Sequence, residues 1–251
     1  AHYRFLLRRS LRGDALEERL HVVPGSTTGV SVTWYEPFGN GRPRCVVSPP
    51  PQFPPSFWDE LLTNLVDGTL FFLDGYAFPS LNTDRVSESA VSLAESRSSL
   101  ILDLANPAIT DNYGAQIVSM LRGLSAAGVE STIFASKEEL APMGGLAALV
   151  ENLSGTKITV VKKEPPTGAA VYRLDGAAVQ PVARFRGESV QAIETTGLGD
   201  AFIAGWITAL LDGVTSLRDR VERAHEVACL CATRVGGTLA SAERDGGVES
   251  S

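Results

Sequence analysis

The stretch Glu194-Thr195-Thr196-Gly197-Leu198-Gly199-Asp200-Ala201-Phe202 sets two glycines and a carboxylate at the start of a long apolar segment. From Phe202 to Leu211 almost every residue is apolar, and Asp212-Gly213 then provides a helix stop. A helix that is apolar nearly all round is typically buried. The stretch therefore predicts a buried helix that begins at a glycine-rich turn.

The start of this helix suits an anion. The first N–H groups of a helix lack partners and carry a partial positive charge, and Gly197 and Gly199 let an anion approach the backbone closely. We expect the same field to hold Asp200 as a carboxylate that can accept a proton from a substrate hydroxyl. In the alternative interpretation Thr195 or Thr196 caps the helix and Asp200 only complements its dipole. These residues alone favour neither.

Composition narrows the class of protein. The 251 residues are 44% hydrophobic and 20% charged, which is enough for a sizeable core, and we expect residues 1–251 to form a single α/β domain. A net charge of −7 argues against binding to nucleic acid or to an anionic membrane, and it favours a small-molecule partner. No apolar stretch reaches the roughly 18 residues that span a membrane.

The cysteines and histidines indicate neither disulfides nor zinc. The cysteines are Cys45, Cys229 and Cys231, an odd number, and the last two face apart on a predicted helix. We expect them to be reduced, which favours a cytoplasmic location. The three histidines are widely scattered, so no cluster has the spacing of zinc ligands.

The chain changes pattern once. Two extended stretches around a turn predict a β-hairpin over residues 28–47, and the proline-rich run 48–55 predicts a stiff connector. Strands and helices alternate from Ser56 onward, which predicts a parallel sheet covered on both faces, with ligands at the carboxyl ends of its strands. The predicted elements are a helix from Ser56, strand 69–73, helix 83–96, strand 99–104, helix 110–127, strand 131–134, helix 137–153, strand 157–162, an antiparallel excursion over 169–184, a helix from Gly199 and a final helix over 216–235.

Residues 194–202 resemble the C-terminal signature of the ribokinase and adenosine kinase superfamily, the PfkB carbohydrate kinases, which reads Asp-Thr-x-Gly-Ala-Gly-Asp-Ala-Phe. Segments 102–107 and 231–237 look like the adenosine-kinase-like branch. The resemblance implies a ribokinase-like three-layer α/β fold, in which helices flank a central mostly parallel sheet. It also implies a small β lid that includes the 28–47 hairpin. Related kinases dimerise through lid strands, so a homodimer through the lid is open by analogy.

The resemblance also implies an activity, the transfer of the γ-phosphate of ATP to a hydroxymethyl group of a sugar or nucleoside. Asp200 would be the catalytic base, and the backbone of Gly197, Leu198 and Gly199 would form the anion hole. The residues implied at the nucleotide are Thr196, Lys162 and His225. Glu139 would orient Mg²⁺ through water.

Several positions depart from the family pattern. Glu194 replaces an Asp at a position linked to the monovalent-cation loop, so potassium use stays open, and Ser136 replaces the Asn of the Asn-x-x-Glu motif that ends at Glu139. Glu164 falls where the family has Thr-x-Gly beside the nucleotide, and it would repel phosphate unless Lys162 or Lys163 compensates. The alternative for Glu139 is a solvated carboxylate at a helix start, and that for His225 is a packed or surface residue.

The N-terminal part matches least well. Segment 12–16 resembles the early Gly-Asp-Asp-x-x-Gly stretch of the family, which leaves this chain without the preceding Gly-Gly motif and the acidic residue that holds the acceptor. The alternative function is therefore a catalytically degenerate member that acts as a binding or scaffold module. A dinucleotide-binding oxidoreductase would need Gly-x-Gly-x-x-Gly after an early strand, and the sequence has none.

Overall fold

The computed structural model describes residues 30–35, 43–48, 60, 62, 67–79, 81, 83–164, 168–175, 178–187, 190–193 and 195–233. The chain divides into two compact units, Ala1–Pro54 and Pro55–Ser251. The boundary falls in the proline-rich run that predicts a connector. The predicted helix start at Ser56 and the signature residue Glu194 lie outside the described residues.

The first unit contains a two-stranded antiparallel sheet. Strand β1 (Val30–Tyr35) pairs with β2 (Pro43–Ser48), in a register that runs from Val30 opposite Ser48 to Tyr35 opposite Pro43. These strands lie in the range predicted for a hairpin, 28–47, except that β2 extends one residue beyond it, to Ser48. The turn predicted at 38–41 lies outside the described residues.

The second unit is built on a six-stranded sheet in which every strand pairs with its neighbour in the sequence, in the order β3-β4-β5-β6-β7-β8. Strands β3 to β6 are parallel, whereas β7 and β8 are antiparallel to the strands before them. The strands are β3 (Leu70–Asp74), β4 (Ser99–Asp103), β5 (Glu130–Ala135), β6 (Lys157–Glu164), β7 (Gly168–Asp175) and β8 (Ala178–Arg186). The structure confirms the predicted mostly parallel sheet and its antiparallel end.

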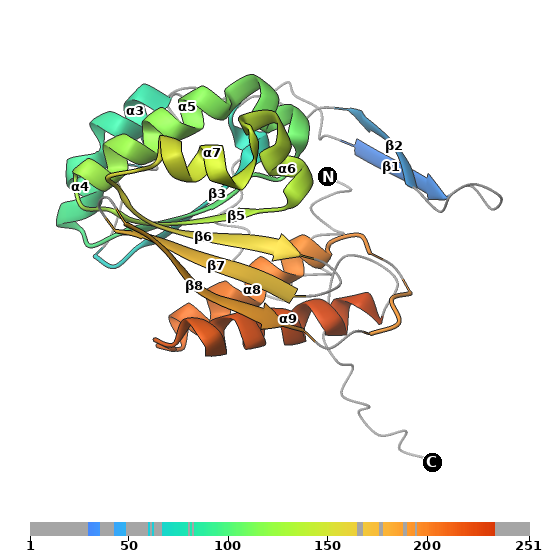
Figure 1. Cartoon of the computed structure of the whole chain (residues 1–251). Helices are drawn as coiled ribbons and strands as arrows, with labels where there is room; N and C mark the ends of the chain where they lie inside the picture. Colours follow the sequence, from blue (N-terminus) through green and yellow to red (C-terminus); the bar gives the residue numbers. More distant parts are fainter. Residues whose placement is uncertain are drawn as a thin grey trace, which may run out of the picture. The chain divides into compact units, whose positions relative to one another are not determined.

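Helices cover both faces of this sheet, which gives three layers (Figure 1). Right-handed crossovers between strands in sequential order place the connecting helices on one face. These are α3 (Thr83–Glu88), α4 (Ala90–Glu95), α5 (Pro107–Ala126), α6 (Lys137–Leu140) and α7 (Gly145–Asn152). Helices α8 (Leu198–Leu211) and α9 (Leu217–Ala232) cover the other face. No helix in the described part of the chain is both long and apolar enough to cross a membrane.

Two predicted helices are interrupted. The helix predicted over 83–96 divides at Ser89 into α3 and α4. The helix predicted over 137–153 breaks into α6, a 3₁₀ turn (Ala141–Met143) and α7. Pro142 lies in that turn, and Gly144 and Gly145 take positive φ angles of 84° and 85°, which end a helix. Helix α5 begins at Pro107, ahead of the predicted residue 110, because the Asn106 side chain accepts a hydrogen bond from the Ala108 N–H.

Helix α8 packs against both the sheet and α9. Its aromatic side chains meet Phe134 of β5, with edge-on ring contacts at centroid distances of 6.2 Å for Phe202 and 5.5 Å for Trp206. Gly205 lets α9 approach closely, because a Cβ there would stand 2.8 Å from the Ala224 Cα. The helix is not buried all round, since Leu211 is 71% exposed near its end. The N-terminus of α8 is thereby fixed at one edge of the sheet.

Candidate functional site

The carboxyl ends of the four parallel strands bring polar side chains to one edge of the sheet. Asp74 ends β3, Asp103 ends β4, Ser136 follows β5, and Lys163 lies one residue before the end of β6. The start of α8 reaches the same edge, because the Lys163 Nζ lies 3.5 Å from the point where a Cβ on Gly199 would stand. The candidate site is therefore assembled from five separate elements of the chain.

The first turn of α8 leaves backbone donors available. Gly197 is the N-cap with a φ angle of 77°, and no side chain caps the helix, so the interpretation of Thr195 or Thr196 as the cap is not supported. The N–H groups of Gly199 and Asp200 have no acceptor within α8 and form no backbone hydrogen bond with the described residues. The Leu198 N–H donates to the Thr195 carbonyl at 3.4 Å, a long bond. Two free donors thus lie beside the Asp200 carboxylate.

Lys163 connects this helix start to the sheet. Its side chain is 13% exposed, and its Nζ donates to Asp103 Oδ1 at 2.9 Å. The same Nζ lies 3.7 Å from Glu139 Oε2. Lys163 thus links β6 to β4 and to the start of α6 through two carboxylates.

Glu139 is fixed by a capping box at the start of α6. The Ser136 N–H donates to Glu139 Oε2 at 2.7 Å, and the Glu139 N–H donates to Ser136 Oγ at 3.2 Å. Glu139 is only 8% exposed, so the alternative interpretation of Glu139 as a solvated carboxylate is not supported. Burial raises the pKa of the Glu139 carboxyl, and the Lys163 ammonium acts in the opposite direction. The residue that replaces the family Asn thus orients the glutamate through a local hydrogen-bond pair.

The pKa of the Asp200 carboxyl also lies above its ordinary value. Partial burial is the largest cause, the charge of Asp103 adds to it, and the Lys163 ammonium opposes it. This differs from the expectation that the helix field would dominate and favour the ionised form. A base with a raised pKa holds a proton more firmly, so the shift is in the direction that favours proton abstraction.

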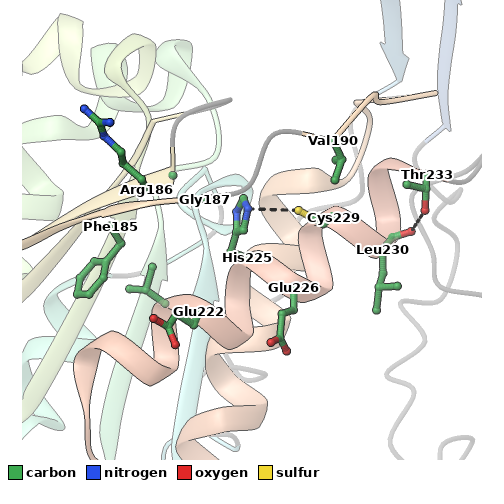
Figure 2. A pocket seen from close by; sticks show the side chains of 12 residues that line it. Phe185, Arg186, Gly187, Val190, Glu222, His225, Glu226, Cys229, Leu230 and Thr233 are labelled. Atoms are coloured by element: carbon green, nitrogen blue, oxygen red, sulfur yellow. Dashed lines mark hydrogen bonds between the residues drawn. The ribbon is translucent and has the colours of Figure 1, made fainter.

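Two adjoining cavities lead away from this edge. The first, of about 540 Å³, is lined by Ser136, Glu139, Lys163, Leu198 and Gly199, and further along by His225 and Cys229 of α9. The second, of about 690 Å³, lies between the end of β8 and α9, and Figure 2 shows its lining residues. His225 and Cys229 line both cavities, with the His225 Nε2 3.3 Å from the Cys229 Sγ.

Gly187 permits this arrangement around His225. A Cβ on Gly187 would stand 2.1 Å from the His225 Cε1, so only glycine lets the chain after β8 pass so close to the imidazole. In Figure 2 the imidazole lies between Gly187 and Cys229. The ring is thereby held at the junction of the two cavities.

The structure brings some of the predicted site residues together. Leu198, Gly199, Glu139 and His225 line the 540 Å³ cavity, and Gly197 and Asp200 belong to the same helix start. Thr196 is exposed just before the helix.

Lys162 does not join them. Side chains alternate across a strand, so Lys162 lies on the face opposite to Lys163, and its Nζ pairs with Glu164 Oε1 at 2.7 Å. Arg184 Nη2 holds the other Glu164 oxygen at 2.9 Å. The hydrogen bond from Lys162 is the largest cause of a lowered pKa at Glu164, and that from Arg184 adds to it. The expected compensation of Glu164 thus comes from Lys162 and Arg184. The residues that sequence reasoning missed are Lys163, Asp103 and Asp74.

A helix start with free N–H groups, at the carboxyl edge of a parallel sheet, is typical of α/β proteins that bind phosphate-bearing ligands. The chain belongs to the pfkB family of carbohydrate kinases, whose family model matches residues 55–244. No curated protein matches the sequence.

Solved structures share the fold at low sequence identity. Adenosine kinase from Sinorhizobium meliloti is 18% identical with a TM-score of 0.57, over 72% of this chain and 53% of that one. Anopheles gambiae adenosine kinase, in complex with P1,P4-di(adenosine-5) tetraphosphate, is 15% identical with a TM-score of 0.66, over 85% and 65%. A fructokinase variant from Vibrio cholerae, bound to fructose, ADP and potassium, is 19% identical with a TM-score of 0.66, over 94% and 77%. This chain spans about half the length of the Sinorhizobium enzyme.

Proposed function

We propose that the protein is an ATP-dependent phosphotransferase that moves the γ-phosphate of ATP to a hydroxymethyl group of a sugar or nucleoside. The observation that carries the proposal is Asp200, which lies in the first turn of α8 beside two free N–H groups. Membership of the pfkB family and the fold shared with adenosine kinases and a fructokinase support the same activity. These relatives divide between the two acceptor classes, so the proposal keeps both.

The chemistry follows from the positions of these groups. The acceptor hydroxyl gives its proton to the Asp200 carboxylate as its oxygen attacks the γ-phosphorus, and the bond from that phosphorus to the β-phosphate oxygen breaks to release ADP. The turn formed by Gly197, Leu198 and Gly199, with the N–H of Asp200, would donate to the phosphate oxygens as charge builds on them. Catalysis in this scheme is positioning plus charge stabilisation.

The described residues fit Mg²⁺ only as a partner of the nucleotide. They contain no group of three His, Cys, Asp or Glu side chains that could hold a metal ion. Mg²⁺ usually binds through one or two carboxylates, water and the substrate phosphates, and Glu139 on the cavity wall would hold it through water. When bound, it would neutralise part of the phosphate charge.

The nucleotide would extend from the start of α8 toward His225. The two cavities adjoin at His225, and the second is lined by apolar atoms of Phe185, Val190 and Leu230, a surface suited to a flat heterocycle. We assign His225 to the nucleotide and Thr196 to its phosphate end. Lys162 would act on it only through Glu164.

The test is ATP consumption over a panel of sugars and nucleosides, with Asp200→Asn beside the unchanged protein. Loss of the base should lower kcat by about 10²–10⁴-fold, while ATP binding measured by calorimetry stays intact. Because the pKa of Asp200 is raised, the rate should fall on the acid side at a higher pH than for an ordinary Asp.

Leu211→Ala provides the control, because Leu211 is exposed at the far end of α8. It should leave kcat and its pH dependence unchanged. A protein that binds no ATP and turns over no acceptor would instead be the degenerate binding module. If Asp200→Asn and the unchanged protein were equally active, Asp200 would have no role in the mechanism.

A further inference from the structure

Lys163 is a partly buried cation of the candidate site. Among the described residues that line the 540 Å³ cavity it is the only lysine or arginine. Its Nζ lies 2.9 Å from Asp103 of β4 and 3.7 Å from Glu139 of α6, and 3.5 Å from the point where a Cβ on Gly199 of α8 would stand. Asp200 is also close enough for the two charges to interact.

The position of this ammonium is electrostatically unusual. The N-terminus of α8 carries a partial positive charge, so a lysine beside it is disfavoured unless anions are present. Asp103 and Glu139 supply part of that negative charge. An oxyanion that binds the free N–H groups of Gly199 and Asp200 would interact favourably with the ammonium and the helix start together.

An incoming triphosphate needs such a cation. It would approach Glu139, Asp103 and Asp200, whose charges repel it. Lys162, the neighbouring lysine, lies on the opposite face and is paired with Glu164. The absence of a side chain at Gly199 leaves the path between the Lys163 Nζ and the helix start open.

We propose that Lys163 is a catalytic residue whose ammonium contacts the γ-phosphoryl group of ATP during its transfer. The inference rests on the proposed kinase function and deepens it. The proton of the acceptor goes to Asp200, so Lys163 takes no part in the proton transfer. The ammonium gives up its long contact with Glu139 and offers that N–H to a phosphate oxygen, while its contact with Asp103 keeps it in place.

The experiment compares Lys163→Met with the unchanged protein in turnover and in calorimetry with ATP, ADP and adenosine. Because the ammonium contacts only the transferred group, kcat should fall about 10²–10³-fold, with little change in the KM of the acceptor. Affinity for ATP should approach that for ADP, whereas adenosine, which has no phosphate, should bind as before. Lys157→Met, the same change at the other end of β6, should alter none of these values.

Two further variants separate a catalytic role of Lys163 from a structural one. Lys163→Met leaves the carboxylates of Asp103 and Glu139 without their cation, which can prevent folding. The double variant Lys163→Met/Asp103→Asn removes one negative charge together with the positive charge, and it replaces the single variant if that one does not fold. It should show the same loss of kcat and of preference for ATP. In Lys163→Ala, added methylammonium should restore part of kcat, which a purely structural role would not allow.

The outcomes separate the two proposals. Should both Lys163→Met proteins keep kcat within about twofold and retain their preference for ATP over ADP, the role of Lys163 is overturned and the kinase stands. If the unchanged protein binds no ATP and phosphorylates no acceptor, the kinase proposal is overturned and the role of Lys163 with it.

Discussion

At the scale of single residues, the candidate site gathers like charges. The charge of Asp103 raises the pKa values of both Asp74 and Asp200, and that of Asp200 raises the pKa of Asp74 further, after partial burial as the main cause. Carboxylates that repel one another lower the free energy of unfolding. The carboxylates gathered at this edge of the sheet are therefore expected to reduce stability.

Asp74→Asn tests this cost. The pKa of Asp74 is raised in the folded protein, so ionisation of Asp74 destabilises the fold above that pKa, and the penalty disappears once pH falls below its ordinary value of 3.8. The amide keeps an oxygen that can accept the Tyr76 N–H hydrogen bond. Asp74 is exposed, so solvent screens part of this repulsion. The free energy of unfolding of Asp74→Asn should therefore exceed that of the unchanged protein by at most about 1 kcal/mol at pH 7, and should equal it near pH 3.

Thermal denaturation across this pH range measures the difference, and Asp111→Asn, an exposed change on α5, provides the control. A gain that grows toward acid pH would contradict the assigned sign.

The sequence pointed to the glycines and Asp200, but of the two lysines it led us to assign Lys162 to the nucleotide, whereas Lys163 lines the cavity. Strand β6 is covered on both faces, so Val160 and Val161 are both fully buried and no alternation reveals which lysine faces α8. Which lysine faces α8 is determined by how β6 pairs with the neighbouring strands. Asp103 belongs to segment 102–107, which resembles the adenosine-kinase-like branch. Its role at the site depends on its hydrogen bond with Lys163, which is 60 residues away in the sequence.

At the scale of elements, the contact between α8 and α9 holds the helix start at the sheet edge. A Cβ on Gly205 would meet the Ala224 Cα at 2.8 Å and the Arg223 carbonyl oxygen at 2.9 Å, both backbone atoms that cannot rotate away. Gly205→Ala should therefore lower the free energy of unfolding by about 1–3 kcal/mol, despite the better helix propensity of alanine.

Gly123→Ala is the matched control within α5. There the new Cβ would meet the Ser87 Oγ at 3.4 Å, an ordinary contact, so the change should be neutral or stabilise by up to about 1 kcal/mol. Chemical denaturation of both variants gives the comparison. A Gly205→Ala protein as stable as Gly123→Ala would mean that α8 and α9 can separate at no cost.

The boundaries of the elements were predictable only where the sequence carries a signal. Pro142, Gly144 and Gly145 are helix-breaking residues that explain the division between α6 and α7. The apolar residues on either side of them follow a helical pattern, so the sequence predicted one continuous helix. Ser89 carries no such signal, because its side chain makes no capping hydrogen bond. The break between α3 and α4 follows from packing, which the sequence does not display.

At the scale of the whole molecule, the second unit contains the six-stranded sheet and every described residue of the candidate site. We predict that residues 55–251 fold alone, with a circular dichroism spectrum rich in helix and an affinity for ATP equal to that of the full chain. If the hairpin acts as a lid, as the resemblance implies, only the KM of the acceptor should rise. Loss of ATP binding in the shorter chain would show that the first unit is needed for the nucleotide site.

The architecture of this unit was largely predictable, because alternating strands and helices allow few arrangements. The antiparallel end was predictable too, since the short link between 164 and 168 leaves no room for a crossover helix. The position of α8 beside β4 and β6 was not predictable, because it depends on contacts between segments that are distant in the sequence.

The sequential strand order has a consequence for synthesis on the ribosome. Each new strand of β3 to β8 finds its partner already present, so the sheet can grow one strand at a time as the chain emerges. Its second face stays bare until α8 and α9 have been made, and Phe134 and Val161 remain exposed until then. A nascent chain stalled before residue 198 should therefore present an apolar sheet face to chaperones, which the later synthesis of α8 and α9 would cover.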